Sequence, residues 1–223
     1  MATLNLEDNY QLRTDPPISD SAKHYLGYLL IGERRKARHL INDLLEKGVP
    51  LKEIYLDIFQ RAQREIGYLW ETNQISVAEE HYCTASTQTI MAQLYPEIIS
   101  NEEKGKVAVI ACVGGELHEL GARMVADFLE MDGWETYYVG ANTPADSLIE
   151  TIQEKQPDLV GLSVTMSFNI TEVKELLERI HREVEIEGKD LKTIVGGRPF
   201  IVAPDLWKKL DDVDGFAEDV EDA

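Results

Sequence analysis

The stretch 107–121, with the sequence V-A-V-I-A-C-V-G-G-E-L-H-E-L-G, most constrains what this chain can fold into. Seven apolar residues in a row are typical of a parallel strand that is buried on both faces, and the two glycines that follow indicate a turn into a helix. Open α/β sheets bind their ligands at the carboxyl ends of the strands. We therefore expect residues 114–121 to lie at a binding site.

The same alternation of strand and helix continues toward the C-terminus. In chain order the sequence predicts strand 107–113, helix 119–131, strand 135–139, helix 144–155, strand 158–164, helix 170–186, strand 192–195, helix 200–210 and strand 215–217. Strands that alternate with helices are typical of α/β domains with a parallel sheet. We predict a Rossmann-like domain over 106–223, with a five-stranded, doubly wound, flavodoxin-like sheet.

The preceding part of the chain has a helical period instead. Between residues 51 and 69 apolar side chains recur every three or four positions, which indicates an amphipathic helix. Caps, glycine stops and apolar stripes predict four helices, one from about residue 20 and the others at 33–47, 50–70 and 77–98. Because the connections are short, we predict an all-α four-helix bundle over 20–100.

Two polar segments flank this predicted bundle. Residues 1–19 contain two adjacent prolines and no clear period, so we interpret them as an N-terminal arm. Residues 101–105, N-E-E-K-G, separate the helical pattern from the strand and helix pattern. We interpret them as the linker between two domains.

Charge and composition exclude several classes of protein. The formal net charge is −19, with 10 basic and 14 acidic residues in 1–100 and 12 basic and 27 acidic residues in 101–223. Nucleic-acid-binding surfaces need a positive balance, so we expect no direct contact with nucleic acid. The chain has neither a long apolar run nor a basic, hydrophobic leader, so we expect a cytoplasmic protein without a membrane partner. Cys83 and Cys112 lack a C-x-x-C spacing, which favours reduced thiols over a zinc site.

The candidate metal ligand in the stretch 114–121 is His118. Glu116 lies two residues before it, and a carboxylate that binds one imidazole nitrogen leaves the other nitrogen to face a metal. The glycine pattern of a dinucleotide site, G-x-G-x-x-G, is not present, so we do not expect a phosphate cradle. The alternative is a histidine at a helix start that is satisfied by its neighbours.

Two further loops leave the same predicted edge of the sheet. They are 162–167, L-S-V-T-M-S, with Ser163, and 195–200, V-G-G-R-P-F, with Gly196 and Gly197. The glycines remove side chains where a ligand comes close, or they form an ordinary strand-to-helix turn. Ser163 can bind a ligand or its own backbone. Neither the clustered aspartates of a phosphoacceptor domain nor the G-x-S-x-G turn of a serine hydrolase is present.

These residues resemble the signature of cobalamin-binding domains. The signature reads D-x-H-x-x-G, then S-x-L, then G-G, and this chain has E-x-H-x-x-G at 116–121, a serine at 163 and two glycines at 196–197. The resemblance covers roughly residues 21–220 and implies a bound cobalamin with its cobalt. It implies that His118 is the lower cobalt ligand and that Glu116 orients it, with Leu117 and Gly121 of the same loop in the cofactor site.

The same resemblance implies a slot for the displaced benzimidazole tail of the cofactor. Ser163, Gly196 and Gly197 are the residues that would line it, and Thr165 belongs to the same cofactor site. Two positions depart from the family pattern. Glu116 replaces the commoner aspartate, which lengthens the side chain by one methylene, and Thr165 replaces the leucine of S-x-L, which affects the detail of the slot.

A second motif lies in the predicted bundle. Trp70 is followed after nine residues by Glu80 and His81, which gives W-x9-E-H. In an unfamiliar protein these would be a buried tryptophan and a core histidine. The motif resembles that of light-sensing, adenosylcobalamin-binding repressors of the CarH type. That resemblance implies that Trp70 and Glu80 contact the adenosyl group in the dark, and that His81 becomes the upper cobalt ligand after photolysis.

The main functional hypothesis is therefore an adenosylcobalamin-dependent light sensor that is not an enzyme. Only about 20 residues precede the first predicted helix, so we expect the chain to lack the MerR-type DNA-binding domain of those repressors. Signalling would then pass through a light-dependent homo-oligomer or a partner protein, or the chain would be the sensor part of a longer protein. The alternative is a corrinoid methyl carrier for a methyltransferase system, which we rank second because Trp70 and His81 would obstruct its open face. A cobalamin store or chaperone is a third hypothesis. No residue indicates an additional bilin chromophore.

Overall fold

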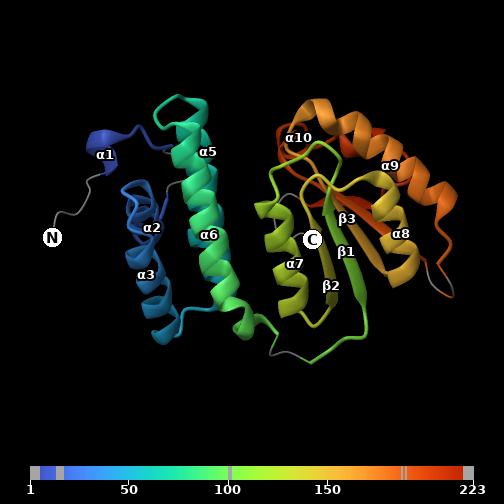
Figure 1. The fold of residues 1–223 in the computed structure, drawn as a ribbon, viewed down its shortest axis with the longest axis horizontal. Coiled ribbons are helices and arrows are strands. Elements are labelled where there is room, and N and C mark those ends of the chain that lie inside the picture. The colour runs from blue at the N-terminus through green and yellow to red at the C-terminus, as the bar shows by residue number, and fades with distance from the viewer. Residues whose placement is uncertain (1–5, 14–17, 100–101, 187, 189, 218–223) are drawn as a thin grey trace. The chain divides into compact units, whose positions relative to one another are not determined.

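The chain divides into two compact units, Met1–Leu94 and Tyr95–Ala223. A computed structural model, shown in Figure 1, describes residues 6–13, 18–99, 102–186, 188 and 190–217. The division falls within helix α6, before the predicted linker at 101–105. Part of that linker lies outside the described residues, and its role stays a prediction.

The first unit is helical. In chain order the described elements are α1 Leu6–Asn9, α2 Asp20–Leu30, α3 Arg34–Glu46, α4 Leu51–Glu53, the π-helix η1 Ile54–Gln60, α5 Arg61–Glu71 and α6 Val77–Ile98. The segments α4, η1 and α5 follow one another without a break, and together they form the helix that the sequence predicts at 50–70. The helical N-terminal part of the predicted fold is thereby confirmed.

Aromatic rings fill the core of the helical unit. Tyr25 of α2 and Phe59 of η1 have ring centroids 5.4 Å apart, and Tyr55 packs against Phe59 at 5.3 Å. All three side chains are fully buried, and α2 packs against α3, η1 and α5. Burial of such large rings gives a small bundle much of its stability, because each removes a large apolar area from water.

Residues 6–13, in the predicted N-terminal arm, pack onto the helical unit. Leu6 is buried beside Gly27, where an added methyl group would lie 3.7 Å from Leu6 Cδ2. The Arg13 backbone N–H donates to Glu65 Oε1 at 2.8 Å, and Arg13 Nε donates to Glu65 Oε2 at 3.2 Å. Because Glu65 is buried, these contacts hold the segment firmly against the helices.

Helix α6 begins with a capping box. Glu79 donates its N–H to Ser76 Oγ at 3.3 Å, and Ser76 donates its N–H to Glu79 Oε2 at 2.7 Å. This reciprocal pair satisfies backbone donors that would otherwise have no partner at a helix start. It fixes the first turn of α6, which carries Glu80 and is followed directly by His81.

The second unit contains a five-stranded parallel sheet of order β2-β1-β3-β4-β5. Its strands are β1 Val107–Cys112, β2 Glu135–Gly140, β3 Leu159–Ser163, β4 Lys192–Gly196 and β5 Gly215–Ala217. This is the flavodoxin-like order that the sequence predicts, and it is confirmed. The order reverses between β1 and β3, so the chain leaves these neighbouring strands toward opposite faces, and ligands of such sheets bind at the carboxyl ends of these strands.

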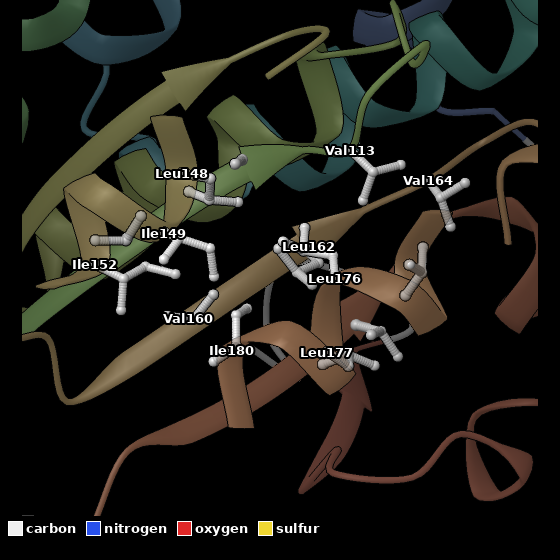
Figure 2. Packing of buried hydrophobic residues seen from close by; sticks show 14 of the residues in the cluster. Val113, Leu148, Ile149, Ile152, Val160, Leu162, Val164, Leu176, Leu177 and Ile180 are labelled. Carbon is white, nitrogen blue, oxygen red and sulfur yellow. The ribbon is translucent and has the colours of Figure 1, made fainter. Parts of the chain in front are cut away.

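Helices cover both faces of this sheet (Figure 1). They are α7 Leu120–Met131 on one face and α8 Ala145–Lys155 and α9 Ile170–Glu183 on the other. Figure 2 shows the larger core, in which Val160 and Leu162 of β3 pack with residues of α8 and α9 such as Leu148 and Leu176. The β1 run alternates between the two cores, since Val109 and Ala111 face one layer while Ala108 and Ile110 face the other. Both faces of β1 are therefore apolar, as its sequence predicts.

The predicted helix at 200–210 is wrong. The structure has a short helix, α10 Arg198–Val202, and a 3-10 turn, η3 Trp207–Lys209. Pro204 explains the break, because the residue before a proline is disfavoured in the helical region, and Ala203 has φ −131° and ψ 79°. Helix α9 begins directly after a short 3-10 turn, η2 Ser167–Asn169, and ends at Glu183, three residues before its predicted end.

Among the described residues, no helix combines the length and apolar character needed to cross a membrane.

Candidate functional site

His118 and Glu116 form a close pair in the loop between β1 and α7. The imidazole Nδ1 lies 2.5 Å from Glu116 Oε1, and the backbone N–H of His118 donates to the same oxygen at 3.1 Å. The Glu116 side chain is fully buried, whereas that of His118 is 51% exposed. The histidine therefore stands at the surface, and its orientation is set from below.

The second carboxylate oxygen of Glu116 is anchored by the loop after β3. Glu116 Oε2 accepts the N–H of Thr165 at 2.8 Å, the N–H of Met166 at 2.9 Å and the Asn169 side-chain amide at 3.4 Å. Burial raises the pKa of Glu116, but the donors from Met166, His118 and Thr165 outweigh it and lower the pKa to about 2. Glu116 is therefore a carboxylate at neutral pH.

This arrangement selects one form of the imidazole. A carboxylate accepts hydrogen bonds, so Nδ1 carries the proton that it donates to Glu116, and the neutral ring keeps a lone pair on Nε2. An imidazole held in this way is the usual form of a histidine that binds a metal through its other nitrogen. The contact predicted from the spacing of Glu116 and His118 is present, while the cobalt ligation stays a prediction.

The predicted residues of the other two loops lie at neighbouring strand ends. Ser163 of β3 is in register with Cys112 of β1 on one side and with Gly196 of β4 on the other. Gly197 follows with φ +109°, and an added Cβ would lie only 1.9 Å from the carbonyl oxygen of Val164. At Gly196 the nearest atom, Ala217 O, would be 3.5 Å from an added Cβ, which is an ordinary contact. Only the second glycine is sterically obligatory.

Three predicted residues have less defined surroundings. Leu117 is among the most exposed large apolar side chains of the protein, beside the exposed ring of His118. Gly121 lies in the first turn of α7, with open space where a Cβ would be. The side chain of Thr165, which replaces the leucine of S-x-L, is not what binds Glu116, since the contact uses its backbone N–H.

Sequence reasoning missed Asn169 and Asn142. Asn169 precedes α9, where its residue type indicates a helix cap, yet the structure shows no side-chain cap there and its amide donates to Glu116 instead. Asn142 follows β2, and its Oδ1 accepts the N–H of Gly115 at 2.8 Å. The spacing of apolar residues in the sequence cannot predict such contacts, because each joins two loops that are distant in the sequence.

In the helical unit the second motif is also placed at the surface. Trp70 at the end of α5 is 42% exposed, and the His81 side chain is 74% exposed. His81 Nδ1 lies 2.6 Å from Glu80 Oε2, while Thr84 donates its hydroxyl to Glu80 Oε1 at 2.9 Å. The alternative of a buried tryptophan and a core histidine is therefore wrong. His81 is paired as His118 is, with its Nε2 left for another partner.

Two other features do not coincide with these residues. A cavity of about 450 Å³ lies near the amino end of β4, among residues such as His181, Lys192 and Asp212, and no predicted site residue lines it. Within the described residues, no three His, Cys, Asp or Glu side chains converge as a metal site made only of protein ligands would require.

The fold and this site define a class: a flavodoxin-like sheet domain that presents one carboxylate-held imidazole at the carboxyl ends of its strands. Residues 106–223 match the family model described as the B12 binding domain, and residues 22–95 match a second model with the same description. The chain belongs to the B12-binding domain family and is a cobalamin-binding protein. The predicted resemblance is confirmed at this level.

Relatives extend over most of the chain. Dimethylamine corrinoid protein 3 of Methanosarcina acetivorans is 25% identical over 177 residues, which are 78% of this chain and 80% of that protein. The dimethylamine corrinoid protein of Methanosarcina barkeri is 26% identical over 198 residues, 87% of this chain and 85% of that protein. Neither name refers to light, so the photoreceptor part of the resemblance gains no support from these relatives.

A solved structure supports the same fold. The monomethylamine corrinoid protein of Methanosarcina barkeri superposes with a TM-score of 0.78 at 19% identity, over 91% of this chain and 94% of that one. At this identity the likeness concerns the fold alone. It confirms the pairing of a helical N-terminal part with a five-stranded cobalamin-binding sheet domain.

Proposed function

We propose that this protein is a corrinoid methyl carrier that serves a separate methyltransferase and is not itself an enzyme. The observation that carries cobalamin binding is the imidazole of His118 held on buried Glu116. What favours a carrier is the matched length and printed description of the relatives, which are named as corrinoid proteins for dimethylamine. This reading replaces the light sensor as the leading hypothesis. A methylated amine is the first donor to test.

The residues of the sheet unit fit a cobalamin. A half-exposed imidazole with a free Nε2 suits a lower cobalt ligand. His118 would hold the cobalt and Glu116 the ring of His118, while Ser163, Gly196 and Gly197 would line the tail slot with Thr165 beside them. Cobalamin, when bound, supplies a cobalt that carries a methyl or an adenosyl group.

His118→Ala tests the ligand assignment. We expect wild-type protein to bind cobalamin with one histidine nitrogen on the lower face, and the variant to lose that nitrogen and about 10- to 100-fold in affinity. Absorption titration gives the affinity, and electron paramagnetic resonance of the reduced Co(II) form with nitrogen-15-labelled protein distinguishes the histidine nitrogen from that of the cofactor's benzimidazole. His181→Ala is the matched control, because His181 is also an exposed histidine paired with a carboxylate, Asp212, at 3.3 Å. A wild-type protein that stays colourless would exclude the proposal.

The second candidate is the adenosylcobalamin-dependent light response, and one observation favours it. Trp70 and His81 lie at the surface, and Glu80, whose side chain is partly buried, holds His81 Nδ1. On this hypothesis His81 would bind the cobalt after the adenosyl group has left, and the protein would change its conformation or assembly. Its partners would then be a second copy of the chain or a signalling protein.

Green light separates the two candidates. If the protein is a carrier, illumination of the adenosylcobalamin-loaded form should leave its elution in size-exclusion chromatography unchanged, and His81→Ala should give the same photoproduct spectrum as wild type. A light sensor should instead change its elution, and only His81→Ala should alter the final spectrum. His24→Ala is the control, since His24 is an exposed histidine of α2 in the same unit. A changed elution that depends on His81 would overturn the carrier proposal.

A further inference from the structure

The loop that carries His118 is tied to the turn after β2. Gly115 donates its N–H to Asn142 Oδ1 at 2.8 Å, and Asn142 donates its own N–H to the carbonyl oxygen of Glu116 at 2.8 Å. Asn142 thus binds the backbone on both sides of the peptide that leads into Glu116. These two hydrogen bonds fix the position of the Glu116 backbone and the direction in which its side chain points into the protein interior.

A second tie lies just after the histidine. Glu119 Oε2 accepts the N–H of Ala141 at 3.1 Å and the hydroxyl of Tyr138 at 3.2 Å. Gly140 makes room for this carboxylate: it has φ +89°, and an added Cβ would come within 3.3 Å of Glu119 Oε2. The residues immediately before and after the Glu116–His118 segment are therefore both fastened to the 140–142 turn.

Asn142 meets two requirements at one position. Its backbone has φ +50°, a left-handed conformation that asparagine tolerates better than most residues, and its side chain supplies the acceptor for Gly115. Glycine could adopt the same backbone but would offer no acceptor. Aspartate would keep the acceptor oxygen. The two roles can therefore be separated by substitution.

We propose that Asn142 and Glu119 are positioning residues for His118, which hold its loop to the turn after β2 so that Nδ1 meets Glu116 and Nε2 faces outward. Glu116 fixes the ring, and the 140–142 turn fixes the segment that presents both residues. This inference rests on the proposed role of His118 as a cofactor ligand. It assigns that task to a strand end for which the sequence predicted no function.

The test compares Asn142→Gly, Asn142→Asp and Glu119→Ala with wild type. We expect Asn142→Gly and Glu119→Ala each to lower cobalamin affinity about tenfold, as changes to groups behind a metal ligand commonly do. Both should raise the fraction of the Co(II) form that lacks the histidine nitrogen in electron paramagnetic resonance. Asn142→Asp should restore the wild-type fraction. Asn73→Gly is the matched control, because Asn73 also has positive φ, at 58°, but lies in the α5–α6 turn.

A cofactor-free readout keeps this inference separate from the proposed function. Nitrogen-15 NMR of the His118 ring should show the proton on Nδ1 in the wild type, and a mixture of tautomers in Asn142→Gly and Glu119→Ala. If wild-type protein bound no cobalamin, the proposed function would fail while the tautomers still tested the positioning role. If all variants kept the wild-type tautomer and, where loaded, the wild-type nitrogen signal, Asn142 and Glu119 would be ordinary turn residues.

Discussion

Gly197→Ala is expected to destabilise the sheet unit by more than about 3 kcal/mol, which is a large share of the usual stability of a single domain. Two independent costs add. An alanine would place its Cβ 1.9 Å from the carbonyl oxygen of Val164, and it would have to adopt φ +109°. The clash is with backbone, so no side-chain rotation can relieve it. Urea unfolding, monitored by circular dichroism, measures the difference in free energy of unfolding between the variant and wild type.

Gly196→Ala is the matched control for this substitution. The two glycines are adjacent, yet an added Cβ at Gly196 meets Ala217 O at 3.5 Å and has no positive φ to satisfy. We expect a change of less than about 1 kcal/mol, because surface and rim positions without strain tolerate small side chains. Equal unfolding midpoints for the two variants would show that the chain around Gly197 relaxes freely, and would contradict the steric assignment.

Glu116→Gln is expected to flatten the acid side of the stability profile. Burial raises the pKa of Glu116, yet the donors from Met166, His118 and Thr165 bring it from 4.5 to about 2 in the folded state. A carboxyl whose pKa is lowered on folding stabilises the protein above its unfolded pKa, and this contribution disappears as the pH falls toward the folded pKa. For a fully buried carboxylate this amounts to about 3 kcal/mol, lost between about pH 5 and pH 2.

The measurement is the difference between two pH profiles. Other carboxyls with lowered pKa, such as Glu183 and Asp214, also contribute to acid unfolding, so wild type alone does not isolate Glu116. Urea unfolding of wild type and Glu116→Gln from pH 2 to pH 7 should give curves that differ at neutral pH and converge in acid. Parallel curves would mean that Glu116 titrates normally in the folded protein.

Most of the fold was predictable because it follows from local patterns. The buried β1 run, the glycines after it and the alternation with helices define a parallel sheet, and the structure has the predicted order. The prediction of a helix at 200–210 was wrong because it followed the apolar spacing and overlooked that Pro204 disfavours a helical conformation at Ala203. The start of α6 was predicted at residue 77, where the structure has it, and the capping box of Ser76 and Glu79 is the physical reason for that start.

The site was predictable only in part. Glu116 and His118 lie close in sequence, so their spacing reported a local contact that the structure contains. Asn142 and Asn169 act across loops, and their residue types indicate turns and caps rather than support for a histidine. At positions 165 and 166 the donor is the main chain, which leaves no mark on the sequence.

The use of main-chain donors at positions 165 and 166 decides how freely these two residues can be substituted. Because peptide N–H groups of Thr165 and Met166 hold the carboxylate, every residue except proline can supply the same two donors. The departure from S-x-L at Thr165 therefore leaves unchanged the hydrogen bond to Glu116, which orients His118. The side chains at these two positions can therefore vary to suit a partner macromolecule that binds this surface, while the hydrogen bonds that hold Glu116 and orient His118 are kept.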